Sequence, residues 1–380
     1  MGIFLIKIVL LARGKIMKVA IFCDYLHSFG GTEYYNATLA MELKKRGIDV
    51  RVFICEKTQN SYWIDRLADC GIKTYEPARN RIDRDDRSVD YEFVDSFIDE
   101  FVSWSPDVIH ASPAANLLKA FLAHKKAPKV PIVATEHTTP CADSAFWYPD
   151  DFKKLLSNVS CFVATCRTSA KGIKDFHGYS GPVKIVPHFI RPPVHKKATR
   201  IPYSVGCIAR MSPEKGIGVL LVAWKMVVAA IPAAKLYLYG DGRVKSYFER
   251  LAFSLGLQNS VVFAGTYDPR DGAGAIAGRH DIFVQPSLFE SIPTSLIELG
   301  MLGKPIVATN VGGIRELVRR DTGILVQSGS TDKLARAIVK LLSSKELQKA
   351  FAANIQKSVG NRYDLDKAVN TIIGVYRSVI

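Results

Sequence analysis

Several features of exported or membrane-embedded proteins are missing from this sequence. No two cysteines form a C-x-x-C pair, and the seven cysteines are odd in number and lie mostly inside apolar runs. We therefore expect small core residues in a reducing compartment rather than a disulfide framework. No run approaches twenty apolar residues, so no membrane-spanning helix is expected. The expected location is the cytoplasm, either free or peripheral on the inner face of the plasma membrane.

The first sixteen residues do not read as a targeting segment. They are apolar but are interrupted by Lys7, and they contain no small-residue cleavage site. They therefore fit neither a membrane span nor a secretory signal. A cleaner strand pattern begins at Met17, so we treat residues 1–16 as an N-terminal extension.

Acidic residues are scarce relative to basic ones. The chain has 51 Lys and Arg against 36 Asp and Glu, and residues 151–200 hold ten basic against two acidic side chains. This balance favours anionic partners such as phosphorylated small molecules, acidic lipid or nucleic acid. A hydrophobic content of 48% excludes a disordered chain.

Short β-branched and apolar runs alternate with helical patterns along the whole chain, which indicates an α/β fold with doubly wound parallel sheets. Strands are expected at residues 18–25, 49–56, 107–111, 131–137, 161–166 and 184–189, and again at 203–209, 234–240, 260–265, 281–287, 304–310 and 323–326. Between the first two strands, a helix capped by Thr32 and ended by Gly47 is expected.

A proline-rich basic segment divides the chain into two Rossmann-like domains that face each other across a cleft. We predict a first domain over residues 17–190, a linker over 191–202 and a second domain over 203–362. The last helix, residues 363–380, is expected to return toward the first domain. Ligands of such sheets bind at the carboxyl ends of the strands.

The loop F-G-G-T-E follows the first strand and opens the first helix. Gly30 and Gly31 allow backbone N–H groups to approach an anion at the helix N-terminus. A plain tight turn explains such a pair equally well.

Arg210 and Lys215 follow the first strand of the second domain, in the segment I-A-R-M-S-P-E-K-G. A planar guanidinium and an ammonium at this position suit the oxygens of a diphosphate. The simpler interpretation is a pair of surface cations beside a loop.

The stretch 285–313 contains two carboxylates eight residues apart, Glu290 in a strand-to-helix loop and Glu298 within the helix, with Pro293 in the first helical turn. On one helix they would lie about 12 Å apart, too far for the acid pair of a glycoside hydrolase. Free N–H groups at the helix start are suited to phosphate.

Taken together, these segments resemble the retaining glycosyltransferases of family four, which have the GT-B fold. The resemblance rests on Glu290-x7-Glu298, Arg210-x4-Lys215, L-Y-G-D-G at 238–242, P-I-V-A-T-N-V-G-G at 305–313 and the early F-G-G loop. It extends over residues 17–380, and T-E-H with His137 occupies the place of a further family segment.

The resemblance also implies roles for individual residues. Arg210 and Lys215 would hold the donor diphosphate, Glu298 would bind the ribose, Glu290 would contact the transferred sugar, and His137 would lie near it. Donor-binding backbone is implied at Gly30, Gly31, Gly265, Thr266, Ser291, Ile292, Pro293, Thr294, Ser295 and Leu296. Positioned cations and helix dipoles stabilise a diphosphate leaving group, so no metal and no other cofactor are expected.

The chain departs from the family pattern at two residues. Ser291 replaces the usual glycine after the first acid, and His188 replaces an asparagine. His188 is expected to line the cleft or to pack in the protein, and for His110 cleft lining and structural capping are both open. Asp83 and Asp85 have D-x-D spacing, but their basic neighbours favour a solvated charge cluster over a metal site.

Residues 146–158 place Phe146, Trp147, Tyr148 and Phe152 beside Lys153 and Lys154. Such a segment either rests on an anionic membrane or packs a helix face on a sheet.

The interpretation that we favour is an enzyme that transfers a hexose, with retention, from a UDP- or GDP-sugar to a glycan or lipid-linked acceptor in surface polysaccharide or glycolipid synthesis. The alternatives are a non-catalytic glycan- or nucleic-acid-binding protein and a nucleotide-sugar epimerase. No nucleic-acid-binding motif occurs, and we expect no nucleic-acid partner.

Overall fold

The computed structural model describes residues 15–24, 26, 30–58, 60–80, 88–112, 117–148, 152–194, 196–267 and 272–380, without the side chains of 143, 146, 147 and 361. The aspartates at 83 and 85 and the side chains of Phe146 and Trp147 therefore lie outside the described part.

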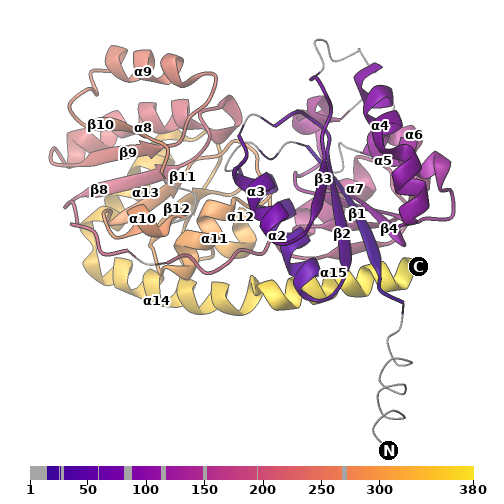
Figure 1. Ribbon diagram of the computed structural model, residues 1–380. Coiled ribbons are helices and arrows are strands. Elements are labelled where there is room, and N and C mark those ends of the chain that lie inside the picture. Colours follow the sequence, from indigo (N-terminus) through magenta and orange to yellow (C-terminus); the bar gives the residue numbers. More distant parts are fainter. Residues whose placement is uncertain are drawn as a thin grey trace, which may run out of the picture.

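Two parallel sheets form two α/β domains, as the sequence predicts (Figure 1). In the first sheet the strand order is β3-β2-β1-β4-β5-β6-β7, and in the second it is β10-β9-β8-β11-β12-β13. Each sheet reverses its winding once, between β1 and β4 and between β8 and β11. These two switch points are where doubly wound sheets bind ligands.

The first sheet contains the strands β1 Lys18–Cys23, β2 Asp49–Ile54, β3 Lys73–Tyr75, β4 Val108–Ala111, β5 Ile132–Glu136, β6 Val159–Ala164 and β7 Val183–Ile185. The second contains β8 Ser204–Ile208, β9 Lys235–Tyr239, β10 Val261–Gly265, β11 Ile282–Gln285, β12 Ile306–Thr309 and β13 Gly323–Val326.

The helices of the first domain are α2 Gly31–Lys45, α3 Tyr62–Asp69, α4 Ser88–Trp104, α5 Leu117–Lys126, α6 Phe152–Leu155 and α7 Arg167–Asp175, with the 3₁₀ helices η2 Ala142–Trp147 and η3 Leu156–Asn158. Those of the second are η4 Pro213–Lys215, α8 Ile217–Ala230, α9 Lys245–Ser254, α10 Gly274–Ala277, α11 Thr294–Met301, α12 Ile314–Leu317, α13 Thr331–Ser343 and α14 Lys345–Arg362. The helix α15 Leu365–Val379 follows.

Each sheet has an apolar core on both faces. In the first domain one core contains side chains of α2, α3 and α15, and the other contains side chains of α4, α5 and α6. In the second domain α8, α9 and α13 cover one face, and α11, α12 and α14 cover the other. Nearly continuous apolar strands are what a sheet covered on both sides requires.

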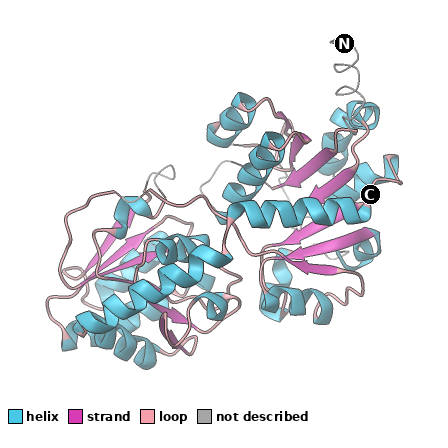
Figure 2. Cartoon of the chain, turned by 90° about the horizontal axis from the view of Figure 1, so that it is seen from below, coloured by secondary structure: helices cyan, strands magenta, loops and turns pink. Residues whose placement is uncertain are grey.

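The helices α14 and α15 run one after the other along both domains (Figures 1 and 2). Val369, Ile372 and Tyr376 of α15 are fully buried in the first domain's core. The Tyr376 hydroxyl lies 2.5 Å from Nδ1 of the buried His110. The last helix is therefore an integral part of the first domain.

Two local predictions were wrong at helix starts. Thr32 lies inside α2, whose N-cap is Gly30, because the chain already turns into the helix at Gly31. Pro293 is the extended N-cap of α11 rather than a residue of its first turn, with φ −65° and ψ 129°.

Five of the seven cysteines are buried, whereas Cys141 is half-buried and Cys70 is exposed, and all seven are free thiols. Burial raises the pKa of the Cys207 thiol to about 12, which makes it unreactive at neutral pH.

Candidate active site

Arg210 and Lys215 come from the loop after β8, at the carboxyl end of the second sheet. Lys215 ends η4, and its Nζ atom lies 2.5 Å from Glu290 Oε2. Both of these side chains are largely buried, whereas the Arg210 guanidinium is half exposed and lies 3.3 Å from Glu214 Oε1. The structure thus brings together a cation and an acid that lie 75 residues apart in the sequence.

The loop that carries these cations is fastened to the loop that carries Glu290. The Leu288 N–H donates to the Glu214 carbonyl at 2.8 Å. Gly216 has φ +68°, and a Cβ there would lie 2.0 Å from the Pro286 carbonyl oxygen. Only glycine permits both this backbone conformation and this close approach, so Gly216 fixes where Lys215 can reach.

Glu298 lies on α11, on the side that faces residues 272–273. Its Oε2 accepts a hydrogen bond of 3.0 Å from the Ala273 N–H. Burial raises the pKa of this carboxyl to about 7, and the backbone hydrogen bond opposes part of that shift. The pKa of the Tyr34 phenol in the first domain is raised by burial and, in smaller part, by Glu298. The charge of Glu298 in the second domain therefore acts on a side chain of the first domain.

The start of α11 is packed rather than open. Ser291, Ile292 and Leu296 are buried, whereas Pro293, Thr294 and Ser295 are half-buried. The Leu296 N–H, predicted to face donor oxygens, already donates to the Pro293 carbonyl at 3.1 Å. Thr294 and Ser295 occupy the first turn of α11, where unpaired N–H groups are usual.

Gly31 begins α2 and lies directly against the start of α11. A Cβ at Gly31 would lie 3.0 Å from Cγ2 and 3.1 Å from Oγ1 of Thr294. At Gly30 a Cβ would lie 2.4 Å from Oε2 of the buried Glu33. The glycine pair of the first domain and the helix start of the second therefore approach each other, as two halves of one site must.

Gly265 and Thr266 lie where β10 ends, also at the carboxyl edge of the second sheet. The Gly265 carbonyl accepts a hydrogen bond of 2.8 Å from the Gly240 N–H. Their predicted contact with the nucleotide base stays a prediction.

His137 follows β5 and packs into a group of rings. Its ring centre lies 4.6 Å from that of Tyr35 and 5.2 Å from that of His188. Its Nε2 lies 2.9 Å from the Ser112 hydroxyl, and its buried Nδ1 has no hydrogen-bond partner within the described residues. Burial and then the neighbouring His188 and His110 lower the pKa of His137 well below its usual value. The ring is therefore neutral at pH 7, with both nitrogens directed into the protein.

The other two histidines considered in the sequence, His188 and His110, are structural. His188 is 4% exposed, which supports packing over cleft lining. His110 bonds Thr135 Oγ1 at 2.6 Å as well as Tyr376, and burial lowers its pKa to about 3.

Three hydroxyls of the first domain bind the second domain, and sequence patterns did not reveal them. The Thr139 hydroxyl donates to the Glu290 carbonyl at 2.9 Å. Thr165 Oγ1 lies 2.7 Å from the Ser291 hydroxyl, and both groups are buried. The Thr168 hydroxyl donates to the Gly312 carbonyl at 3.1 Å. Ser291, the departure from the family glycine, is therefore used for an interdomain hydrogen bond.

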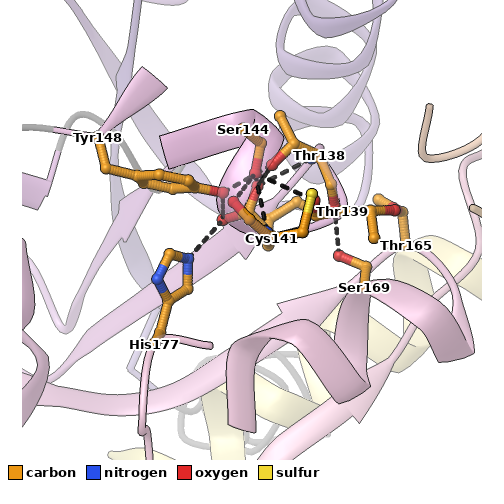
Figure 3. A network of polar contacts seen from close by, with 9 residues as sticks. Thr138, Thr139, Cys141, Ser144, Tyr148, Thr165, Ser169 and His177 are labelled. Carbon is orange, nitrogen blue, oxygen red and sulfur yellow. Dashed lines mark hydrogen bonds and ion pairs between the residues drawn. The ribbon is translucent and has the colours of Figure 1, made fainter. Parts of the chain in front are cut away.

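A buried carboxylate, Glu136, fixes the loop that carries Thr139. Its Oε1 accepts the N–H and the O–H of Thr138, both at 2.8 Å, and its Oε2 accepts the Tyr148 hydroxyl at 2.9 Å. His177 Nε2 lies 3.8 Å from Oε2, and the Ser169 hydroxyl donates to the Thr138 carbonyl (Figure 3). The sequence motif T-E-H contains Glu136, but its hydrogen bonds to Thr138 and Tyr148 were not predicted from it.

In the aromatic segment 146–158, the two aromatic side chains that the structure describes are buried rather than on the surface. Tyr148 is 7% exposed and Phe152 is 2% exposed, because both belong to the core beneath α5. Membrane contact through these two rings is therefore wrong, and the alternative of helix packing is correct. Lys153 and Lys154 remain exposed. No helix of the described part of the chain is long and apolar enough to cross a bilayer.

Comparison with known families gives two matches along the chain. The family described as "Glycosyltransferase Family 4" matches residues 29–192, and "Glycosyl transferases group 1" matches residues 195–358. Similar curated proteins include an uncharacterized glycosyltransferase of Methanocaldococcus jannaschii, 26% identical over 71% of this chain and 75% of that protein. A GDP-mannose-dependent phosphatidylinositol monomannoside mannosyltransferase of Corynebacterium glutamicum is 31% identical over 39% of this chain and 40% of its own length.

Solved structures share the fold over almost the whole chain. Anabaena Alr3699/HepE, in complex with UDP and glucose, superposes with a TM-score of 0.79 at 20% identity, over 94% of this chain and 99% of that one. Sucrose-phosphate synthase of Thermosynechococcus elongatus gives 0.78 at 18% identity, over 96% and 99%.

Proposed function

Because this chain belongs to the family-four glycosyltransferases, we propose that it transfers a hexose, with retention, from a UDP- or GDP-sugar to a hydroxyl of a glycan or lipid-linked acceptor. The observation that carries the proposal is the meeting of Lys215 with Glu290 beside the contact of Gly31 with Thr294. A nucleotide sugar has an anion and a sugar joined at one bond, so its site needs a cation and a hydroxyl acceptor side by side.

In the proposed mechanism Arg210 and Lys215 bind the diphosphate. The bond between the anomeric carbon and the phosphate oxygen breaks, and negative charge accumulates on the departing diphosphate. The acceptor hydroxyl oxygen bonds to the anomeric carbon on the same face, and its proton passes to the departing phosphate oxygen. Cations already in position stabilise that charge without reorganisation. The ion pair with Glu290 fixes the direction of the Lys215 ammonium, so this cation needs little reorganisation to meet a diphosphate.

Glu298 and Glu290 would bind hydroxyl groups at the two ends of the donor. An ionised Glu298 accepts hydrogen bonds from ribose hydroxyls, and Glu290 accepts from the sugar. The N–H groups of Thr294 and Ser295 face phosphate oxygens at the start of α11. The neutral His137 ring supports the sugar side of the cleft by position rather than by charge.

The names of similar proteins support this donor class. The relative from C. glutamicum is named as GDP-mannose-dependent, and the Anabaena structure holds UDP and glucose. A relative from Rhizobium meliloti is a lipopolysaccharide core glycosyltransferase, which supports a surface glycan or glycolipid as acceptor. These names are of transferases, which favours transfer over epimerisation.

The test is a thermal-shift screen with UDP, GDP and ADP, followed by nucleotide release from a panel of UDP- and GDP-sugars with and without acceptors. We expect stabilisation by UDP or GDP and release that depends on acceptor, with the anomeric configuration of the product read by NMR. Lys215→Gln should abolish release, whereas Lys225→Gln, at an exposed position of α8, should not. Stabilisation by none of the nucleotides would overturn the proposal, and an inverted product would overturn retention.

A further inference from the structure

A basic cavity of about 550 Å³ lies between the two domains, outside the donor site described above. Its walls come from three helices that are far apart in the sequence, α7 of the first domain and α12 and the end of α14 in the second. The lining residues are Arg167, Thr168, Lys171, Arg315, Glu316, Arg319 and Arg362. Cavities of this size bind small molecules.

The acidic residue of the lining is already occupied. The Glu316 carboxylate forms an ion pair with Arg362, and its Oε1 accepts the Arg167 N–H at 2.8 Å. This acid therefore joins the two domains and neutralises the guanidinium at the end of α14.

Two arginines of the cavity have no carboxylate partner within the described residues. The Arg315 guanidinium donates only to neutral oxygens, the Gly312 carbonyl at 3.2 Å and the Thr168 hydroxyl at 3.1 Å. The Arg167 side chain is exposed, and in the part of the chain that the structure describes its guanidinium forms no ion pair and no hydrogen bond. By contrast, Lys171 pairs with Asp175, and Arg319 Nε lies 3.7 Å from Asp321.

We propose that this cavity binds a phosphate dianion or a diphosphate, at a site separate from that of the donor. Two guanidinium groups that have no carboxylate partner in the described part of the chain, one from each domain, can each donate two parallel hydrogen bonds to phosphate oxygens. Lys171 and Arg319 also line the cavity, but their charges are offset by the neighbouring carboxylates of Asp175 and Asp321. A free phosphorylated compound and a phospholipid headgroup present this same chemistry.

Binding at this site also joins the domains. Arg167 and Arg315 approach the ligand from opposite domains. Among the described residues, the ligand would reinforce two hydrogen bonds between α7 and α12. One runs from the Arg167 N–H to Glu316, and the other from Arg315 to the Thr168 hydroxyl. The occupied site therefore favours the domain arrangement seen here over a more open one.

The test titrates inorganic pyrophosphate into the protein by calorimetry at physiological ionic strength, with UDP or GDP present to occupy the donor site. Arg167→Gln removes a guanidinium that forms no ion pair or hydrogen bond with the described residues, so the fold should be retained. We expect its pyrophosphate affinity to fall about tenfold or more, the loss of charge-assisted hydrogen bonds. The matched control is Arg320→Gln, which removes an equally exposed charge outside the cavity and should keep the affinity within about twofold.

The outcomes distinguish binding at this cavity from binding at the donor site and from nonspecific electrostatic attraction of pyrophosphate to the basic protein. Equal affinity in the wild type and Arg167→Gln, or an equal loss in Arg167→Gln and Arg320→Gln, would overturn the proposal. Loss only in Lys215→Gln would also overturn it, because pyrophosphate would then be bound at the donor site. Binding to phosphatidylglycerol vesicles that pyrophosphate competes away, and that Arg167→Gln weakens, would identify a lipid headgroup. Binding of pyrophosphate without binding to vesicles would identify a free phosphate compound.

Discussion

Replacing Glu298 by glutamine should stabilise the protein at alkaline pH and weaken its binding of nucleotide. Burial raises the pKa of Glu298 from its usual 4.5 to about 7. Between these two pH values the folded chain holds a proton that the unfolded chain has lost. The stability of the wild type therefore falls as pH rises from 4.5 to 7, and above pH 7 the full cost of the ionised Glu298 remains without further change.

The magnitude follows from the difference between the two pKa values. A difference of about 2.5 pH units at 1.36 kcal/mol each corresponds to about 3 kcal/mol. Glutamine is nearly isosteric and can still accept the Ala273 N–H through its carbonyl oxygen. The stability of Glu298→Gln relative to the wild type should therefore be near zero at pH 4.5 and rise by about 3 kcal/mol at pH 8.

The assay is urea unfolding of the ligand-free protein at intervals from pH 4.5 to pH 8, followed by circular dichroism. The control is Glu249→Gln, at an exposed position of α9, which should change stability little at any pH. A difference between Glu298→Gln and the wild type that does not vary with pH would refute the reasoning. Nucleotide affinity gives a second readout, since ribose hydroxyls favour the ionised carboxylate and wild-type affinity should rise through pH 7.

Three further predictions follow from other contacts. Lys215→Met removes the ammonium beside Glu290 and should lower turnover about a hundredfold or more, measured by nucleotide release. Gly31→Ala places a Cβ 3.0 Å from the Thr294 methyl group, which should separate the two halves of the site and raise the KM for the donor in steady-state assays. Tyr376→Phe leaves His110 Nδ1 without its partner and should cost about 1–3 kcal/mol in urea unfolding.

For each of these variants, a specific result would contradict the prediction. Unchanged turnover in Lys215→Met would show that the ammonium does not act on the leaving group. For Gly31→Ala the control is Gly218→Ala, whose Cβ would meet its nearest neighbours at an ordinary 3.8 Å. An equal rise in KM for both glycine variants would contradict the assigned contact. Wild-type stability in Tyr376→Phe would contradict the assigned bond.

The sheets could be predicted from the sequence because buried parallel strands are apolar on both faces. The run V-A-I-F-C in β1 and the run I-F-V-Q in β11 leave little alternative. The edge strand β3 has the sequence K-T-Y and is half exposed, so it carries no such signal and was missed. The predicted strands that end at 111, 265 and 326 end correctly, and the others were predicted to end one to four residues too late, because residues of a following loop can stay extended after the ladder ends.

The candidate site was predicted in part. Lys215 and Glu290 were identified from spacing, but their direct contact was not, since 75 residues separate them. The interdomain hydroxyls of Thr139 and Thr165 were missed because a single threonine has no pattern around it. The two interpretations of the segment around Tyr148 stayed open because amphipathic and core aromatic residues look alike until the sheet beneath them is known.

The place of α15 imposes an order on how the protein is made. Its buried residues complete a core whose other members end at Phe189, about 175 residues before α15 begins. At 5–20 residues per second, a ribosome needs roughly 9 to 35 seconds to cross that interval. Throughout this time the nascent first domain presents an uncovered apolar groove and a His110 without its phenol partner. Tags or truncations at α15 will therefore damage the half of the enzyme that was translated first.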